Sequence, residues 1–241
     1  MHSKLLEHYG VKTKIAGSDY NFRYQTAGKN VVDDMTRLLD ELQVKPEEVY
    51  TGQQLHTATI AYADGVNGDP FVFGRTFKET DGLLTDKVGI GLLIKYADCT
   101  PIILYDPVNK LLANVHSGWR GTTKCISTKA IEQMINEYGS KPENIVAYVG
   151  PSIDQKNYEV GAEVYEEFRD FTDRDQFFTK KGEKYTLSML DANVDSLIKA
   201  GIKPGNMEIE RASTFTDDRL HSARKEGQHY QLNGLFAMMT I

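Results

Sequence analysis

The chain has 241 residues, of which 40% are hydrophobic and 26% are charged, and its formal net charge is −6 at pH 7. This length supplies a full hydrophobic core, and we expect one domain over residues 1–241. Because both signs of charge are mixed and the balance is negative, the composition argues against a nucleic-acid-binding protein. No apolar run reaches the roughly 20 residues that span a bilayer, and residues 1–10 lack the apolar core of a signal peptide, so no membrane partner is expected.

Hydrophobic periodicity predicts the elements along the chain. They are a helix over 30–43, an extended segment over 51–63, buried strands over 82–85 and 90–95, a hairpin with strands over 102–105 and 111–115, a helix over 122–138, a strand over 145–149, helices over 162–171 and 188–200, and a strand over 232–241. Strands joined by hairpins, with helices between groups, favour an α+β fold over a doubly wound parallel sheet. We expect mixed, largely antiparallel sheets with packed helices in one layered domain.

The two cysteines, Cys99 and Cys125, make no disulfide framework, which predicts a protein of the reducing cytoplasm. Cys125 falls near the start of an expected helix, towards its polar side, and we interpret it as inert. Cys99 lies between Asp98 and the pair Thr100-Pro101, and we take it as the candidate for chemistry. Nothing in the sequence predicts an oligomeric state.

Cys99 and His116 bracket the expected hairpin, whose turn chemistry lies at 106–110. If the turn is centred between Pro107 and Val108, paired positions sum to 215 and Cys99 faces His116. Directly opposed residues have Cβ atoms about 4.5–5.5 Å apart. This thiol and imidazole are therefore expected either to share a metal ion or to form a nucleophile–base pair.

His56 is the candidate third ligand, because it follows Gln54 in the extended segment and precedes an apolar stretch. One thiolate and two imidazoles match the ligands that Zn²⁺ prefers, and three protein ligands leave the fourth position open, as in catalytic sites. Copper is chemically tolerable, but a multicopper cluster needs more than six scattered histidines. Asp98 could orient a ligand or transfer a proton, or it could cap a strand end. The remaining histidines are expected at the surface: His2, His8, His221 and His229.

The segment after His116 has the features of an anion site. Gly118 and Gly121 allow unusual backbone angles, and a helix follows, with free N–H groups and a positive dipole end. Arg120 adds a planar fork of donors for phosphate or carboxylate. In the alternative interpretation the glycines form turns, Trp119 packs against the core and Arg120 is a surface charge.

Six strings of residues occur here in the same order as in a known family. They are Gln54-Leu55-His56, Asp81-Gly82-Leu83-Leu84-Thr85, Ala97-Asp98-Cys99-Thr100-Pro101, His116-Ser117-Gly118-Trp119-Arg120-Gly121, Gly150-Pro151-Ser152-Ile153 and Tyr158-Glu159-Val160-Gly161. The chain resembles the laccase-domain family, the bacterial YlmD-like and YfiH-like proteins that are also called multicopper polyphenol oxidase-like. The resemblance is strong over roughly residues 30–161 and loose elsewhere.

The resemblance implies a purine nucleoside phosphorylase that also deaminates adenosine and cleaves methylthioadenosine, with purine nucleosides and phosphate as its small-molecule partners. It implies zinc at the positions of His56, Cys99 and His116, in a layered fold related to a bacterial cysteine toxin domain. We hypothesise that Arg120 and the N–H groups after Gly121 hold phosphate, while the metal site organises the purine or its leaving-group proton.

Both ends of the chain depart from the family pattern. The N-terminal segment lacks the usual Gly-Asn-Leu-Gly-type string and has Asn21-Phe22-Arg23-Tyr24 near that place. Towards the C-terminus, Ser213-Thr214 and His221-Ser222-Ala223-Arg224-Lys225 stand where the family often has a Cys-Thr pair and a Ser-Tyr-Arg-Arg string. Substrate contacts from the two ends are therefore expected to differ. Three alternatives remain open at this point: copper-dependent phenol oxidation, a metal-free hydrolase using Cys99 with His116, and a binding protein without turnover.

Overall fold

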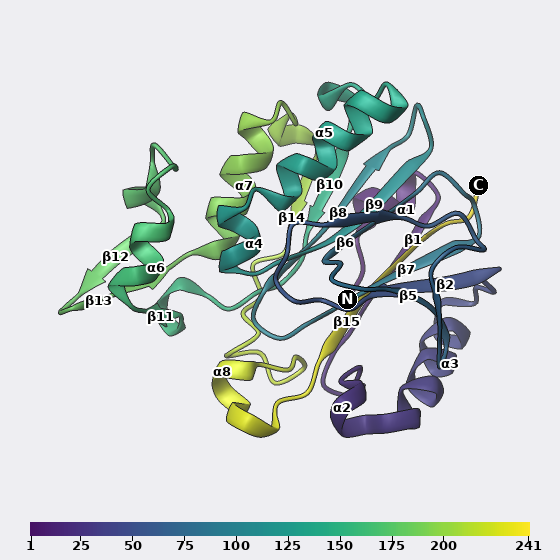
Figure 1. Cartoon of the computed structure of the whole chain (residues 1–241), viewed down its shortest axis with the longest axis horizontal. Helices are drawn as coiled ribbons and strands as arrows, with labels where there is room; N and C mark the ends of the chain where they lie inside the picture. The colour runs from purple at the N-terminus through teal and green to yellow at the C-terminus, as the bar shows by residue number, and fades with distance from the viewer.

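The computed structural model describes residues 1–241 and contains two six-stranded sheets and one three-stranded sheet (Figure 1). The first sheet has the order β1 (Val11–Ala16), β15 (Asn233–Met239), β7 (Ile90–Tyr96), β2 (Glu48–Gly52), β5 (Gly74–Phe77) and β4 (Asp69–Phe71). The second has the order β14 (Met207–Ile209), β10 (Val146–Val149), β8 (Thr100–Asp106), β9 (Leu111–Ser117), β6 (Gly82–Thr85) and β3 (Ile60–Tyr62). Both sheets mix parallel and antiparallel pairs, which confirms the predicted mixed fold.

The two large sheets pack face to face around one core. Leu92 and Ile94 of β7 meet Ile103 and Tyr105 of β8 in a cluster of 19 buried residues. Burying one such aliphatic side chain stabilises the fold by about 1.5–3 kcal/mol. Because both faces of the central strands are covered, β8 and β9 are buried at every position, which explains their continuous apolar runs.

Helices cover the outer faces of this sandwich, so the molecule has four layers (Figure 1). The helix α3 (Val31–Leu42) packs on the first sheet, and α5 (Ile126–Tyr138) and α7 (Met189–Lys199) pack on the second. The shorter helices are α1 (Lys4–His8), α2 (Tyr24–Ala27), α4 (Trp119–Thr123) and α8 (Ala223–Glu226). No helix is both long enough and apolar enough to cross a membrane.

A small lobe stands at one end of the sandwich, on the left of Figure 1. It consists of β11 (Glu159–Val160), α6 (Ala162–Glu167), β12 (Phe178–Lys181) and β13 (Lys184–Leu187). Its own apolar cluster contains Phe168, Phe178 and Leu187, and Trp119 of α4 packs against it. The lobe is therefore tied to the segment that follows His116.

The hairpin forms as predicted, but its register is shifted, so that each residue of β8 pairs two residues further along β9 than expected. Thr100 pairs with Ser117 and Asp106 with Leu111, so paired positions sum to 217 rather than 215. The shift arises because Asp106 accepts the N–H groups of Val108 and Asn109 and closes a four-residue turn. Cys99 therefore precedes β8 and is not directly opposite His116.

Two further predictions about local structure are wrong. The segment 51–63 is not one strand, because β2 ends at Gly52, β3 begins at Ile60, and His56 lies in the loop between them with φ +58°. The helix expected over 122–138 is split into α4 and α5, because Cys125 has φ +58° and interrupts it. The other expected helices and strands form with ends shifted by a few residues.

Candidate active site

The structure brings together the three residues predicted as ligands. Cys99 comes from the turn between β7 and β8, His116 from the end of β9, and His56 from the loop after β2. The Sγ atom of Cys99 lies 3.8 Å from Nε2 of His56, and the two imidazole rings have centroids 5.2 Å apart. The three ligand atoms all lie within 4.8 Å of one another, which confirms the predicted cluster.

Asp81 organises this cluster, and sequence reasoning missed it. Its fully buried carboxylate accepts the N–H groups of Leu55, His56 and Thr57 at 3.1, 3.1 and 2.8 Å. The same carboxylate accepts a hydrogen bond from Nδ1 of His116 at 2.9 Å. One side chain thus fixes the His56 loop and the ring of His116. The string beginning at Asp81 was noticed in the sequence, but nothing in it indicated that both histidines would meet there.

Charge interactions in the cluster favour an ionised pair. Burial opposes ionisation of Cys99, but His116 and His56 outweigh it and lower the thiol pKa to about 6. Burial also opposes the imidazolium of His116, but Cys99 and Asp81 outweigh it and raise its pKa to about 9. At neutral pH the metal-free site therefore holds a thiolate, the form of cysteine that binds metals and acts as a nucleophile.

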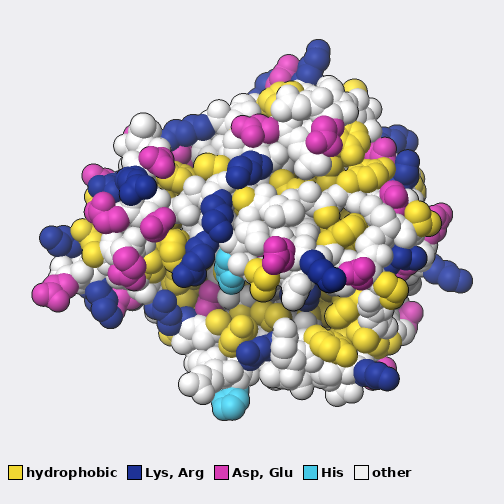
Figure 2. Space-filling view, viewed as in Figure 1, with side chains coloured by type: hydrophobic (Ala, Val, Ile, Leu, Met, Phe, Trp, Pro, Cys, Tyr) yellow, Lys and Arg dark blue, Asp and Glu magenta, His cyan; other side chains and the backbone are white.

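The three residues open into a cavity of about 590 Å³, a volume typical of sites for small molecules. Its aromatic walls come from Phe22, Tyr24, Phe71, Tyr96 and Tyr230. Polar and charged side chains also line it, among them Gln53, Gln54, Lys78 and Lys95. Figure 2 shows a histidine side chain near the centre of one face, beside Lys and Arg side chains and at the edge of a hollow with apolar side chains in it.

A family model described as multi-copper polyphenol oxidoreductase laccase matches residues 6–239. The chain belongs to this family. A purine nucleoside phosphorylase of Bacteroides thetaiotaomicron is 31% identical over 80% of this chain and 74% of its own length. A protein of an unknown prokaryotic organism, named adenosine deaminase RL5, is 31% identical over 82% and 80% of the two chains.

Among solved structures, the YfiH protein of Bacillus licheniformis is similar to this chain. The two share 26% sequence identity and a TM-score of 0.88, over 95% of this chain and 92% of the other. The laccase-family fold expected from the sequence strings is therefore confirmed. The Bacteroides thetaiotaomicron protein and RL5 are named for reactions of nucleosides, whereas the family's description names a polyphenol oxidoreductase.

The cluster in this laccase-family member fits a zinc ion. Tetrahedral bonds of 2.3 Å to sulfur and about 2.05 Å to nitrogen place these ligand atoms roughly 3.5 Å apart, close to the 3.8 Å observed between Cys99 and His56. The contact of Nδ1 of His116 with Asp81 is the carboxylate–histidine arrangement found at metal sites. A Cβ atom at Gly118 would lie 2.9 Å from Sγ of Cys99 and 2.8 Å from Cδ2 of His56, so only glycine leaves this space open.

Two other residues expected at the site, Arg120 and Gly121, do not line the cavity. Gly121 is buried in α4, and the exposed Arg120 guanidinium lies 4.1 Å from the centre of the Trp119 ring. The helix does begin directly after His116, with Gly118 as its N-cap. The first turn of α4 therefore follows His116 as expected, while the side chain of Arg120 stacks on Trp119.

Asp98 connects the site to the C-terminal part of the chain. Its carboxylate accepts the hydroxyl of Thr214 at 2.6 Å and the backbone N–H of Arg224 at 2.7 Å. Asp98 itself has φ +79°, a conformation that is uncommon for residues other than glycine and that clusters at functional sites, although aspartate adopts it more readily than most. The structure thus gives Asp98 contacts that position the neighbouring Cys99 and the chain opposite it.

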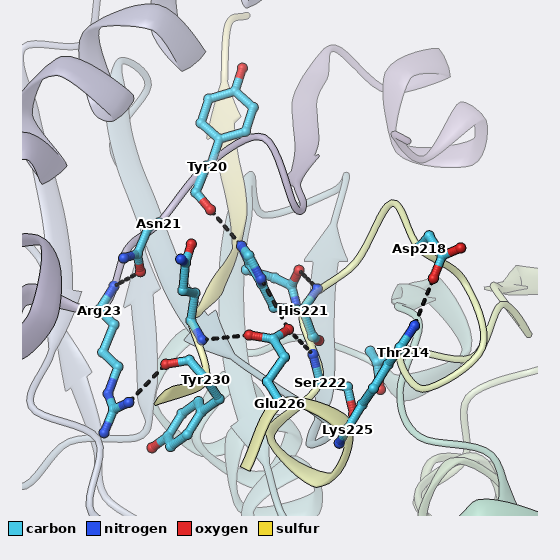
Figure 3. Close-up of polar contacts among 12 residues, drawn as sticks. Tyr20, Asn21, Arg23, Thr214, Asp218, His221, Ser222, Lys225, Glu226 and Tyr230 are labelled. Atoms are coloured by element: carbon cyan, nitrogen blue, oxygen red, sulfur yellow. Dashed lines mark hydrogen bonds and ion pairs between the residues drawn. The ribbon is translucent and has the colours of Figure 1, made fainter. Parts of the chain in front are cut away.

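The surface position expected for His221 is wrong, because the residue is only 6% exposed and its ring lies between two segments of the chain (Figure 3). Its Nε2 lies 2.6 Å from the carbonyl of Tyr20, and its Nδ1 lies 3.2 Å from Glu226. Nearby, Arg23 donates to the carbonyl of Tyr230 at 2.7 Å. These contacts fix the divergent ends of the chain as one wall of the cavity. The other three histidines expected at the surface are exposed: His2, His8 and His229.

Proposed function

We propose that this protein is a zinc-dependent purine nucleoside phosphorylase that acts on adenosine, inosine and methylthioadenosine and also deaminates adenosine. The observation that carries the proposal is the His56–Cys99–His116 cluster at a cavity large enough for a nucleoside. The similarity to a phosphorylase and to an adenosine deaminase supports the choice of substrate. Copper is the alternative metal, since the same thiolate and imidazoles tolerate it.

Different residues of the site bind the purine, orient His116 and position the neighbouring chain. Aromatic side chains in the cavity, such as Tyr24 and Phe71, whose rings lie 5.5 Å apart, offer flat apolar surfaces to a purine. Asp81 holds the Nδ1 proton of His116, which leaves Nε2 as the ligand atom. When bound, zinc supplies a Lewis acid at this position. We assign Asp98 to positioning, because both of its oxygens bind the segment opposite.

The reaction is tested by product analysis on inosine and adenosine with and without inorganic phosphate. We expect free base and ribose 1-phosphate only when phosphate is present, and some inosine from adenosine. His116→Ala should abolish both reactions, while His2→Ala, at an exposed histidine outside the cavity, serves as the control. Base release without phosphate, giving free ribose, would make the protein a hydrolase and refute the phosphorylase assignment.

The metal is tested separately, by elemental analysis of protein purified without chelator. We expect up to one zinc per chain, lost in His56→Ala and Cys99→Ala with the fold retained. Full activity without any metal would favour the alternative in which the Cys99 thiolate and the His116 imidazolium act alone. Bound copper together with oxygen-dependent phenol turnover would favour the oxidase named in the family's description.

A further inference from the structure

Lys95 places an ammonium group in the cavity without a countercharge. The residue is next to last in β7, and its side chain lines the cavity together with His56, Cys99 and His116. Its Nζ donates to the carbonyl of Gly52 at 2.9 Å, and no carboxylate forms an ion pair with it. The nearby carboxylate of Asp81 is already bonded by His116 and by the His56 loop.

Partial burial of the Lys95 ammonium group without an ionic partner costs free energy. Burial lowers the pKa of Lys95 to about 8, against the opposing charge of Asp81. An uncompensated charge in a low-dielectric site costs free energy unless a ligand supplies the missing partner. An ammonium has three donors, and the Gly52 carbonyl uses one of them, so two remain for oxygen atoms in the cavity.

The position of Lys95 is also fixed relative to the metal ligands. Gln54 bonds both backbone groups of Lys95, with Nε2 to its carbonyl at 2.5 Å and Oε1 to its N–H at 2.9 Å. Gln54 is two residues before His56, so the same loop carries a ligand and anchors the lysine. A second cation, Lys78, lines the cavity with an 80% exposed side chain and lies 3.7 Å from Asp69.

We propose that Lys95 binds a phosphate dianion inside the cavity, beside the His56–Cys99–His116 cluster. The proposal rests on the proposed function, and it assigns the anion to Lys95 rather than to Arg120, which does not line the cavity. In phosphorolysis an oxygen of hydrogen phosphate bonds to C1′ of the ribose as the bond from C1′ to the purine nitrogen breaks. The electron pair of that bond leaves with the base, and the proton of hydrogen phosphate ends on the base. The held dianion is thus the nucleophile.

The first test compares kinetic constants of the zinc-loaded variants Lys95→Met and Lys95→Arg with wild type. Loss of one charged partner predicts a KM for phosphate raised roughly ten- to a hundredfold in Lys95→Met, with a change of less than about threefold in KM for inosine. Lys95→Arg should recover part of the loss. Lys129→Met, at an exposed lysine of α5 outside the cavity, is the matched control. If Arg120→Ala raises the phosphate KM instead, the assignment to Lys95 is overturned.

A second arm identifies the source of the phosphate group. Inosine 5′-monophosphate carries the same dianion on the substrate rather than in solution. If Lys95→Met raises KM for this nucleotide and leaves the phosphate KM unchanged, the lysine binds a phosphoryl group of the substrate and the free-phosphate assignment is wrong.

Direct binding separates this proposal from the proposed function. Titration of zinc-loaded protein with inorganic phosphate, followed by calorimetry, should show binding to wild type and to Lys129→Met, weakened at least about tenfold in Lys95→Met. Such a result supports Lys95 even if wild type released no base from nucleosides, an outcome that would refute only the phosphorylase. Equal phosphate binding by wild type and Lys95→Met, with both folded by circular dichroism, overturns the proposal. If Lys95→Met does not fold, Lys95→Gln is used for the same titration.

Discussion

Asp81→Asn should weaken the proposed zinc site more than any other change outside His56, Cys99 and His116, because one carboxylate holds both histidines. The substitution keeps the size of the side chain and removes its charge. It removes the charge that attracts the His116 ring, and it turns an amide NH₂ either towards His116 and the N–H group of His56 or towards the N–H groups of Leu55 and Thr57. Removing one partner of a buried pair costs about 3–5 kcal/mol of folding free energy. Loss of such an outer partner typically weakens metal binding about 10- to 100-fold.

The shifted pKa values of Asp81 and His116 predict how the stability of the fold depends on pH. The pKa of Asp81 is lowered from 3.8 to about 2, so its stabilisation is present above about pH 4 and is lost as pH falls towards 2. The pKa of His116 is raised from 6.5 to about 9, so its stabilisation is present below pH 6.5 and is lost as pH rises through 9. In metal-free Asp81→Asn, the loss of stability between pH 6.5 and 9 should become shallower, and what remains comes from Cys99.

Asp106→Asn is the matched control, since Asp106 is as buried as Asp81 and also binds backbone N–H groups. It lies at the turn of the β8–β9 hairpin, at the other end of β9 from His116. Chemical denaturation of metal-free protein measures stability, and zinc competition with a chelator measures affinity. Both variants should lose stability, and Asp81→Asn alone should lose zinc affinity. The reasoning is refuted if Asp81→Asn binds zinc within about twofold of wild type, or if Asp106→Asn weakens zinc binding equally.

Three further outcomes test the site. In metal-free protein at pH 6, iodoacetamide should alkylate Cys99 faster than Cys125. The reason is that the histidines outweigh burial and lower the pKa of Cys99 to about 6, whereas burial raises the pKa of Cys125. Peptide mass spectrometry measures both alkylation rates, and faster alkylation of Cys125 would contradict the reasoning. Zinc should protect Cys99 and leave Cys125 unchanged, as the same labelling checks. Gly118→Ala should reduce zinc content at least about tenfold, since its Cβ would lie 2.9 Å from Sγ of Cys99, whereas Gly121→Ala, with no contact closer than 3.4 Å, should retain the metal.

The sequence was sufficient to predict that His56, Cys99 and His116 lie together, because they belong to short strings of unusual chemistry next to recognisable strands. It was insufficient for the hairpin register, because Asp106, Pro107 and Asn109 suit turns of two or of four residues equally well. The difference depends on where the side chain of Asp106 bonds, and that is settled only once the strands pair.

The residues that support the cluster were harder to predict for a related reason. Asp81 is separated from His56 and His116 in sequence, and a carboxylate before a strand is ordinarily a cap or a turn residue. Likewise, Lys95 stands in an apolar strand and carries no local sign of a ligand, whereas Arg120 stands in a glycine-rich string that suggested one. Only the packing of the strands shows which cation faces the cavity.

Two buried aspartates divide the site into a fixed part and a variable part. Asp81 binds the His56 loop and His116, so the His56–Cys99–His116 cluster depends on residues within the central sheets. Asp98 binds Thr214 and Arg224, so the wall opposite Cys99 depends on the divergent C-terminal segment. Changes in that segment can therefore reshape the wall without moving the ligands. Under the proposed function, we therefore expect the chain to differ from its relatives in which group it accepts at the 5′ position of a nucleoside.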